Sequence, residues 1–268
     1  MSRPPEAEPP RLSVAIIAMN EAHRIERCLR SAAFADEIVL VDSGSSDDTA
    51  AIARAHGARV IETADWPGFG PQKNRALAAC RGRWVLSLDA DEEVTAALRA
   101  AILAAIEPSP AQERVNGYWV RRSSSWCGRT IRFGDWRNDR VLRLFRREAA
   151  RFSDDLVHER VECAPPLATL DGVLLHDSVD SRADALEKMH RYARLGADKL
   201  RARGRGGLAA AWLHGAWTFV RGYLLRLGFL DGRAGLAIAV LNARGTWLRY
   251  RLAGRAARYP SGFPGEPR

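Results

Sequence analysis

Residues 12–106 alternate short apolar runs with helical patterns, and this alternation limits the fold more than any other feature of the sequence. Strands that are buried on both faces of a sheet read as continuous apolar runs. Four runs of this kind are Leu12–Ala18, Glu37–Val41, Arg59–Glu62 and Trp84–Leu88. Because a helical pattern follows each of them, the sequence predicts an α/β fold with a doubly wound, mostly parallel sheet.

The pattern changes after about residue 113. Short alternating runs at Gly117–Arg121, Val141–Phe145 and Ala168–Leu175 predict a small antiparallel extension of the sheet. From Ser181 onward the pattern is helical, with a glycine-rich break at 204–207 and two apolar segments after it. We therefore expect a disordered leader over residues 1–11, an α/β domain over 12–180, a basic helical region over 181–258 and a flexible tail over 259–268.

Basic residues are concentrated at the C-terminal end of the chain. Residues 191–268 hold 15 Lys and Arg and 3 Asp and Glu, whereas residues 1–190 hold 26 and 29. A basic segment of this kind typically meets phosphate, either in nucleic acid or in an anionic membrane leaflet. Apolar segments bordered by Trp and Arg are typical of helices in the membrane interface, although a helical subdomain packed on the core has the same pattern. We expect peripheral membrane contact and no nucleic-acid partner.

The N-terminus does not read as a targeting signal. The first eleven residues carry acids and prolines where a signal peptide needs an apolar run. The charge-free stretch Gly206–Val220 has about 15 residues, which is too short to span a bilayer. Cys28, Cys80, Cys127 and Cys163 follow no metal-binding spacing and are expected to be idle thiols. We therefore expect a cytoplasmic protein on the inner face of the cytoplasmic membrane.

Two carboxylates, Asp89 and Asp91, directly follow the fourth apolar run. Ligands bind at the carboxyl ends of the strands in open α/β sheets, so both side chains are expected at the ligand-binding edge. Because bare carboxylates repel each other, the pair indicates Mg²⁺ or Mn²⁺ shared with substrate phosphate oxygens. Such an ion would neutralise the charge that grows on a leaving diphosphate. The alternative is that these acids, with Glu92 and Glu93, begin the next helix.

Polar residues also follow the first two apolar runs. Asn20 and Glu21 follow the first, and Asp42 ends the second before a Ser-Gly-Ser turn. A carboxylate in that place can accept a hydrogen bond from a base or a ribose, or it can form an Asx-turn. Lys73 opens a predicted helix and is suited to a nucleotide phosphate, although it can also be an ordinary solvated lysine.

Four ordered motifs resemble the inverting glycosyltransferases of family 2. They are Val14–Glu21, Glu37–Ser46, Trp66–Asn74 and Trp84–Glu93. Within that family the chain is most similar to bacterial lipopolysaccharide core-biosynthesis glycosyltransferases, over about residues 12–200. The resemblance implies a GT-A nucleotide-diphospho-sugar transferase fold. It also implies transfer of a hexose such as glucose from a nucleotide sugar, expected to be a UDP-sugar, to a lipopolysaccharide-core or other lipid-linked acceptor.

The resemblance further implies roles for individual residues. Asp42 would contact the nucleoside, with Asn20 and Glu21 beside it in the donor site. Lys73 would lie near the base or the phosphate. Asp89 and Asp91 would bind the ribose and the metal. A single displacement would invert the anomeric centre, and this step needs a general base for the acceptor hydroxyl.

We predict Glu159 as the general base. A family-2 enzyme places a carboxylate after the two-aspartate motif, often in an acidic pair. This chain has Val157–Arg160 there instead, in a register that matches the related core enzymes. Competing candidates are Asp154, Asp155 and Asp139. His176, or alternatively His158, would complete the metal or diphosphate site, although a single histidine is more often structural.

The stretch 126–147 combines tryptophan with many arginines. Sugars stack on tryptophan, and arginine binds phosphate in a bidentate manner, so Trp136 and Arg143 are candidates for acceptor binding. For most of these arginines the alternative is a solvated strand face.

Other functions fit the sequence less well. A nucleotidyltransferase also uses a doubly wound sheet, but it opens with a glycine-rich loop where this chain has Met19-Asn20-Glu21. A non-catalytic basic module that binds membranes or nucleic acid would leave Asp42, Lys73 and the two aspartates without a purpose. A polyprenyl-phosphate glycosyltransferase is an alternative within the same reaction class.

Overall fold

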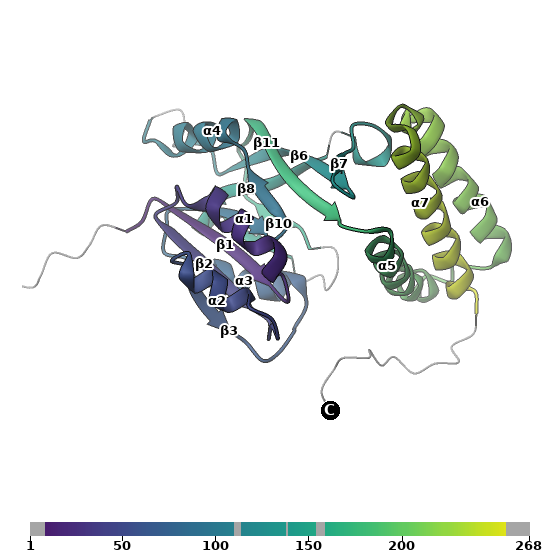
Figure 1. Ribbon diagram of the computed structural model, residues 1–268, viewed down its shortest axis with the longest axis horizontal. Coiled ribbons are helices and arrows are strands. Elements are labelled where there is room, and N and C mark those ends of the chain that lie inside the picture. The colour runs from purple at the N-terminus through teal and green to yellow at the C-terminus, as the bar shows by residue number, and fades with distance from the viewer. Residues whose placement is uncertain (1–8, 110–113, 138, 154–158, 256–268) are drawn as a thin grey trace, which may run out of the picture. The chain divides into compact units, whose positions relative to one another are not determined.

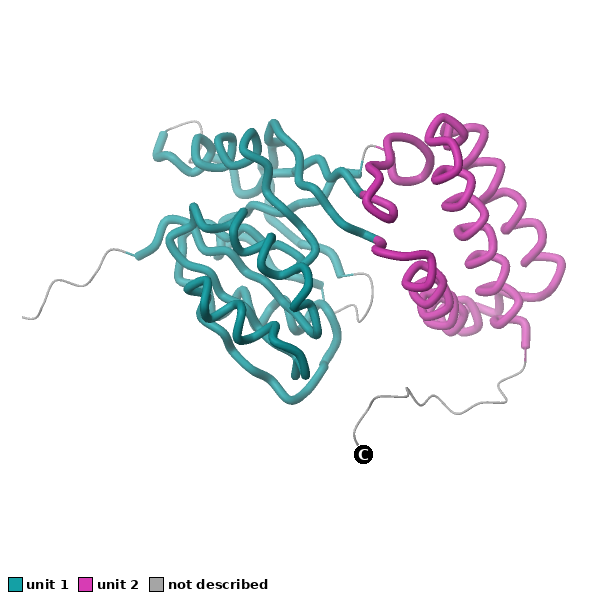
Figure 2. Tube along the Cα trace, viewed as in Figure 1, with its two compact units in different colours: residues 1–124, 138–178 teal, residues 125–137, 179–268 magenta. Residues whose placement is uncertain are grey.

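The computed structural model describes residues 9–109, 114–137, 139–153 and 159–255, which fall into two compact units (Figures 1 and 2). The first unit, teal in Figure 2, comprises residues up to 124 and 138–178. The second unit, magenta, comprises 125–137 and the chain from 179. The sequence predicts a helical region from residue 181, but it does not predict that 125–137 joins that region.

One mixed sheet organises the first unit. Its parallel part has the strand order β3-β2-β1-β4, and the strands β8, β6, β11 and β5 continue it. The bounds are β1 Leu12–Ala18, β2 Glu37–Asp42, β3 Arg59–Glu62, β4 Trp84–Asp89, β5 Glu92–Val94, β6 Gly117–Trp126, β8 Arg140–Arg146 and β11 Leu167–Val179. β8 pairs antiparallel with both β4 and β6. The predicted α/β fold with an antiparallel extension is confirmed.

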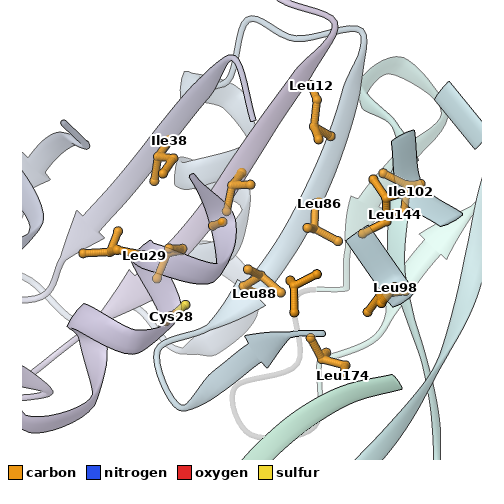
Figure 3. Close-up of a cluster of buried hydrophobic side chains, with 14 of the residues drawn as sticks. Leu12, Cys28, Leu29, Ile38, Leu86, Leu88, Leu98, Ile102, Leu144 and Leu174 are labelled. Carbon is orange, nitrogen blue, oxygen red and sulfur yellow. The ribbon is translucent and has the colours of Figure 1, made fainter. Parts of the chain in front are cut away.

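Helices cover both faces of the parallel part. Side chains of α1 (Ala22–Ala32), α2 (Thr49–Ala55) and α4 (Ala96–Ile106) pack in one buried cluster, part of which Figure 3 shows. Side chains of α3 (Phe69–Ala79) pack in a second cluster. Strand β1 contributes to both clusters, because its alternate residues point to opposite faces of the sheet. A separate ribbon of β9 (Ala150–Phe152) and β10 (Val161–Cys163) packs on the α3 side.

Two local features differ from the sequence prediction. The helix predicted to open at Lys73 begins at Phe69, and Pro71 lies in its first turn, where a missing N–H costs no hydrogen bond. After Asp91 the chain forms the strand β5 before α4 begins. Thr95 caps α4 by accepting a hydrogen bond from the Leu98 N–H. Glu92 therefore belongs to the sheet and not to a helix N-terminus.

The second unit contains three helices, α5 (Arg182–Ala202), α6 (Leu208–Phe219) and α7 (Gly232–Ala253), in the part of the chain that the structure describes. α7 packs against both of the others. A π-helical turn at Val220–Leu225 and a 3-10 turn at Gly228–Asp231 connect α6 to α7. Among the described residues, none of the helices combines the length and the apolarity that crossing a membrane requires.

Residues 125–137 belong to the second unit because charged groups and a small core hold them there. The buried carboxylate of Asp231 accepts a hydrogen bond from the Phe133 N–H at 2.8 Å. Asp135 forms an ion pair with Arg226 at 2.8 Å. The short strand β7 (Arg129–Thr130) pairs with the end of β6. The core of this part consists of Trp126, Ile131, Val179, Ala185 and Ile238.

Glu37 is a buried carboxylate at the start of β2. It accepts hydrogen bonds from Ser13 Oγ at 2.6 Å and from Arg81 Nε at 2.8 Å, and Arg59 Nη2 lies at 3.2 Å. Burial raises the pKa of Glu37, but the hydrogen bonds from Ser13 and Arg81 outweigh it and lower the pKa to about 2. The ionised carboxylate therefore stabilises the folded state.

We expect Glu37→Gln to lower the free energy of unfolding at pH 7 by about 2 kcal/mol, because charged hydrogen bonds in a buried place are lost. The native pKa is about 2 and the unfolded value is about 4.3, so this stabilisation is complete above pH 4.3 and disappears as the pH falls toward 2. Urea unfolding of both proteins at a series of pH values should therefore show a difference that shrinks on acidification. Glu107→Gln, which removes an exposed ion pair with Arg11, should change stability by less than about 0.5 kcal/mol. A difference that is independent of pH would contradict this role of Glu37.

Candidate active site

Three parallel strands bring polar side chains to the same edge of the sheet. In the register of the sheet, Ala18 of β1 lies beside Asp42 of β2, and Ile17 lies beside Asp89 of β4. Asn20 and Asp91 follow two residues after the ends of β1 and β4. The strand-end edge that the sequence indicates is therefore formed.

Asp42 and Asn20 connect the loops that follow β2 and β1. Asp42 is buried, and its two carboxylate oxygens accept hydrogen bonds from the N–H and the hydroxyl of Ser45. The Ser45 hydroxyl accepts a hydrogen bond from the Asn20 N–H at 2.9 Å, and Asn20 Oδ1 accepts one from the Ser46 N–H at 2.8 Å. Asn20 has φ +57°, a conformation that asparagine tolerates better than most residues. These bonds give the first two loops a defined shape at the edge.

Lys73 of α3 lies between two carboxylates. Its Nζ is 2.8 Å from Asp89 Oδ1 and 2.9 Å from Glu159 Oε1, and its side chain is buried. Burial lowers the pKa of Lys73, but the carboxylates of Asp89 and Glu159 outweigh it and raise the pKa above its usual value. The charged lysine therefore links Glu159 to the end of β4.

Asp89 also pairs with Arg143 of β8. The buried guanidinium contacts Asp89 Oδ2, and its Nη2 lies 2.5 Å from Glu92 Oε1. Glu92 in turn accepts a hydrogen bond from the Asp89 N–H at 3.0 Å and lies 3.3 Å from Arg122 Nη1. Burial raises the pKa of Asp89, but the adjacent Arg143 and Lys73 hold it well below its usual range. Asp89 is thus an ionised carboxylate with both oxygens paired.

Asp91 faces a different set of side chains. His176 Nε2 lies 3.4 Å from Asp91 Oδ2, and Arg24 Nη1 lies 3.9 Å from the same oxygen. The other ring nitrogen of His176, Nδ1, is 2.9 Å from Ser124 Oγ. The Asp177 N–H donates a hydrogen bond to the Asp91 carbonyl oxygen at 3.0 Å, which fixes β11 to this loop. The contact with the Ser124 hydroxyl thus orients the His176 ring so that its Nε2 faces Asp91.

The three-ligand metal site predicted from the sequence is brought together only in part. Asp91 and His176 lie side by side, whereas both oxygens of Asp89 contact Lys73 and Arg143. Across residues 9–255, outside the undescribed gaps, no group of three His, Cys, Asp or Glu side chains could hold a metal ion. A carboxylate and an imidazole nonetheless suit Mn²⁺, and a diphosphate could supply further oxygen ligands. The residues present fit a metal that is bound together with its substrate.

The remaining sequence candidates lie in different places. Arg143, predicted to bind the acceptor, is instead a buried partner of Asp89 and Glu92. Trp136 lies in the second unit, half-buried, with its ring centroid 6.2 Å from that of Trp126. Asp139 forms an ion pair with Arg122, and Glu21 Oε2 lies 3.5 Å from Arg24 Nη1. Asp154, Asp155 and His158 lie outside the described residues.

Glu92 and Arg24 are site residues that the sequence did not indicate. Both are buried, and both contact the side chain or the backbone of a strand-end aspartate. A signal was present for the cation that pairs with Glu92, because Arg143 interrupts the apolar strand 140–146 at a position flanked by Leu142 and Leu144. An arginine in such a place needs a buried acidic partner. The sequence alone does not say which acid that is.

Comparison with known proteins assigns the chain to a family. A model described as glycosyl transferase family 2 matches residues 13–163, which is more than half of the chain. The chain belongs to glycosyltransferase family 2. The resemblance inferred from the four sequence motifs is thereby confirmed.

Relatives of this family-2 glycosyltransferase match most of its length. It is 29% identical over 255 residues to an uncharacterised glycosyltransferase of Rickettsia typhi, covering 89% of this chain and 85% of that protein. It is 29% identical over 263 residues to the lipopolysaccharide core biosynthesis glycosyltransferase LpsC of Rhizobium meliloti, covering 91% and 94%. Among solved structures, glucosyl-3-phosphoglycerate synthase from Mycobacterium tuberculosis with Mn²⁺, UDP-glucose and phosphoglyceric acid is 29% identical. That match covers 43% of this chain and 44% of that one, with a TM-score of 0.34.

We expect Arg143→Met to lower the free energy of unfolding by about 3–5 kcal/mol, because Asp89 and Glu92 would stay buried without their cation. Urea unfolding at pH 7 measures the change. Arg140→Met is the matched control, since Arg140 is an exposed arginine on the same strand, and it should cost less than about 0.5 kcal/mol. Equal, small losses in the two variants would show that the buried ion pairs do not hold this edge together.

Proposed function

We propose that this chain is an inverting glycosyltransferase that moves a hexose, such as glucose, from a UDP-sugar to a lipopolysaccharide-core or related lipid-linked acceptor. The observation that carries the proposal is the convergence of Lys73, Asp89 and Glu159 at the end of β4, next to Asp91 and His176, in a family-2 chain. These groups supply a cation for a phosphate, a base for an acceptor and two ligands for a metal.

In the proposed donor complex, the diphosphate lies against Lys73, Asp91 and His176. Mn²⁺ or Mg²⁺ held by Asp91 and His176 would neutralise the charge that develops on the leaving diphosphate. Lys73 adds a fixed positive charge, because the adjacent carboxylates keep it protonated. Asp42, with Asn20 and Glu21 after the neighbouring strand β1, would receive the nucleoside part of the donor once Ser45 exchanges its hydrogen bonds for those of the ligand.

Glu159 is the proposed general base. Its carboxylate would accept the proton of the acceptor hydroxyl as that oxygen forms its bond to the anomeric carbon. The bond between the same carbon and the diphosphate oxygen breaks on the opposite side, so the configuration is inverted. The contact between Lys73 Nζ and Glu159 Oε1 at 2.9 Å supports this role, because it holds the Glu159 side chain next to the place where the diphosphate would bind.

The acceptor and the location of the enzyme are inferred from two further observations. The Rhizobium meliloti relative, which aligns over 94% of its length, is named a lipopolysaccharide core biosynthesis glycosyltransferase. The C-terminal 78 residues carry a net charge of +12, which favours contact with an anionic membrane leaflet. Both support a peripheral enzyme on the cytoplasmic face of the membrane, where a lipid-linked acceptor is available.

Glu159→Gln should retain donor binding and lose transfer, because the amide keeps the shape of the side chain but cannot accept the proton. We expect the rate of transfer to fall by about 10²–10⁴-fold. Titration with UDP-sugars and measurement of transfer in the same preparation separate the two effects. Glu162→Gln, at an exposed carboxylate on the following strand, should transfer at the wild-type rate. Normal transfer by Glu159→Gln would place the base elsewhere.

Asp91→Asn should remove the effect of metal on donor binding, because it replaces a charged metal ligand with a neutral amide. A screen of nucleotide sugars for thermal stabilisation, with and without Mn²⁺, gives the reference for the wild type. We expect a metal-dependent rise in melting temperature with the correct donor, and no such rise in the variant. Asp171→Asn, on the exposed face of β11, should behave like the wild type. Unchanged metal dependence in Asp91→Asn would contradict the proposed metal site.

A further inference from the structure

Helix α6 exposes large apolar side chains and buries small ones. Trp212, Leu213 and Trp217 are 64%, 70% and 52% exposed. The buried positions are Ala211 and Gly215, and a Cβ on Gly215 would meet Trp247 of α7 at 3.2 Å. A surface helix of a globular protein normally has the reverse arrangement, with apolar residues inward and polar residues outward. The small residues thus allow α6 to pack closely on α7, while the large apolar side chains stay exposed and are available to contact another surface.

The exposed apolar surface continues into the turns after α6. Leu224, Leu225, Phe229 and Leu230 are all exposed, and Leu225 is 63% exposed. We call the following set the α6 face: Leu208, Trp212, Leu213, Trp217, Leu224, Leu225, Phe229 and Leu230. α6 itself contains no charged residue. A surface of this kind marks an interaction site rather than ordinary solvent-exposed chain.

Positively charged residues border the α6 face along the chain. Arg203 and Arg205 precede it and Arg233 follows it, and all three are exposed. Between residues 199 and 255, Asp231 is the one acid, and it is buried with its carboxylate bonded to the Phe133 N–H. The partner that complements this surface is therefore apolar at its centre and anionic at its border.

We infer that the α6 face lies in the headgroup region of an anionic lipid bilayer. This inference rests on the proposed membrane contact and names the surface that makes it. Tryptophan and leucine side chains enter the boundary between headgroups and acyl chains, and arginines bind the lipid phosphates. A second copy of the chain fits less well, since a two-fold interface would place the arginine border against its own equivalent.

The same turns hold the segment 125–137 in the second unit. Asp135 pairs with Arg221 and Arg226, and Asp231 binds the backbone at Arg132 and Phe133. Trp136, a candidate for acceptor binding, thus belongs to the segment that is attached to the lipid-facing turns. A lipid-linked acceptor would approach the protein from this surface.

The test is sedimentation with vesicles made of equal parts phosphatidylcholine and phosphatidylglycerol. Leu213→Gln with Trp217→Gln, in one protein, should weaken vesicle binding about tenfold or more, because two large apolar side chains no longer leave water. Arg203→Gln with Arg205→Gln should weaken binding to these vesicles and reduce its dependence on salt. Trp119→Gln, at an exposed tryptophan of the first unit, should bind as the wild type does.

Two outcomes would overturn the inference. One is equal vesicle binding by the wild type and the Leu213/Trp217 variant. The other is a stable wild-type dimer in sedimentation velocity that is absent from the Leu213/Trp217 variant, because the partner of the α6 face would then be a second copy of the chain. Circular dichroism and donor-induced thermal stabilisation check that the variants are folded. Vesicle binding needs no catalysis, so the two proposals can fail separately. A protein that transfers sugar but does not bind vesicles contradicts this inference alone. A protein that binds vesicles but does not transfer sugar contradicts the proposed function alone.

Discussion

Two buried cations make the carboxyl end of β4 stable. Asp89, Glu92 and Glu159 would otherwise place three carboxylates close together in a region where burial makes every unpaired charge costly. Lys73 comes from α3 and Arg143 from β8, so the network joins the parallel half of the sheet to its antiparallel extension. These charged side chains thus stabilise the fold and also form the site. The shape of the strand-end edge depends on each carboxylate having a cationic partner.

The pairing of these carboxylates with Lys73 and Arg143 limits how the proposed donor can bind. Because Lys73 and Arg143 already neutralise Asp89, the proposed divalent ion would depend on Asp91 and His176 and on oxygens that the substrate brings. An arriving diphosphate would also compete with Asp89 and Glu159 for Lys73. Under the proposed function, donor binding would weaken the hold of Lys73 on Glu159 at the moment when that carboxylate is needed as a base. Lys73 would then couple donor binding to the release of Glu159, the proposed base, from its ion pair.

The sequence was sufficient to predict the features of the fold that local residue patterns determine. The apolar runs from Leu12 to Leu88 gave the parallel strands, and parallel pairing then brings Asp42 and Asp89 to one edge. The pairs that depend on distant parts of the chain could not be predicted. Arg143 meets Asp89 across 54 residues because β8 pairs with β4, and Asp231 meets Phe133 across 98 residues. The alternative in which Glu92 begins a helix stayed open because no local signal marks a three-residue strand that pairs with β11.

The two parts of the chain use their charges in opposite ways. In residues 1–190 acids and bases nearly cancel, and at the site they cancel in buried pairs, so this part exerts little long-range attraction on a diphosphate. Under the proposed function, donor recognition would then come from local contacts such as Lys73. In residues 191–268 basic residues outnumber acidic ones by 15 to 3, and exposed arginines border an apolar face. Under the two proposals, long-range attraction would act through the helical part and draw the chain toward an anionic surface, while short-range contacts in the other part would select the donor.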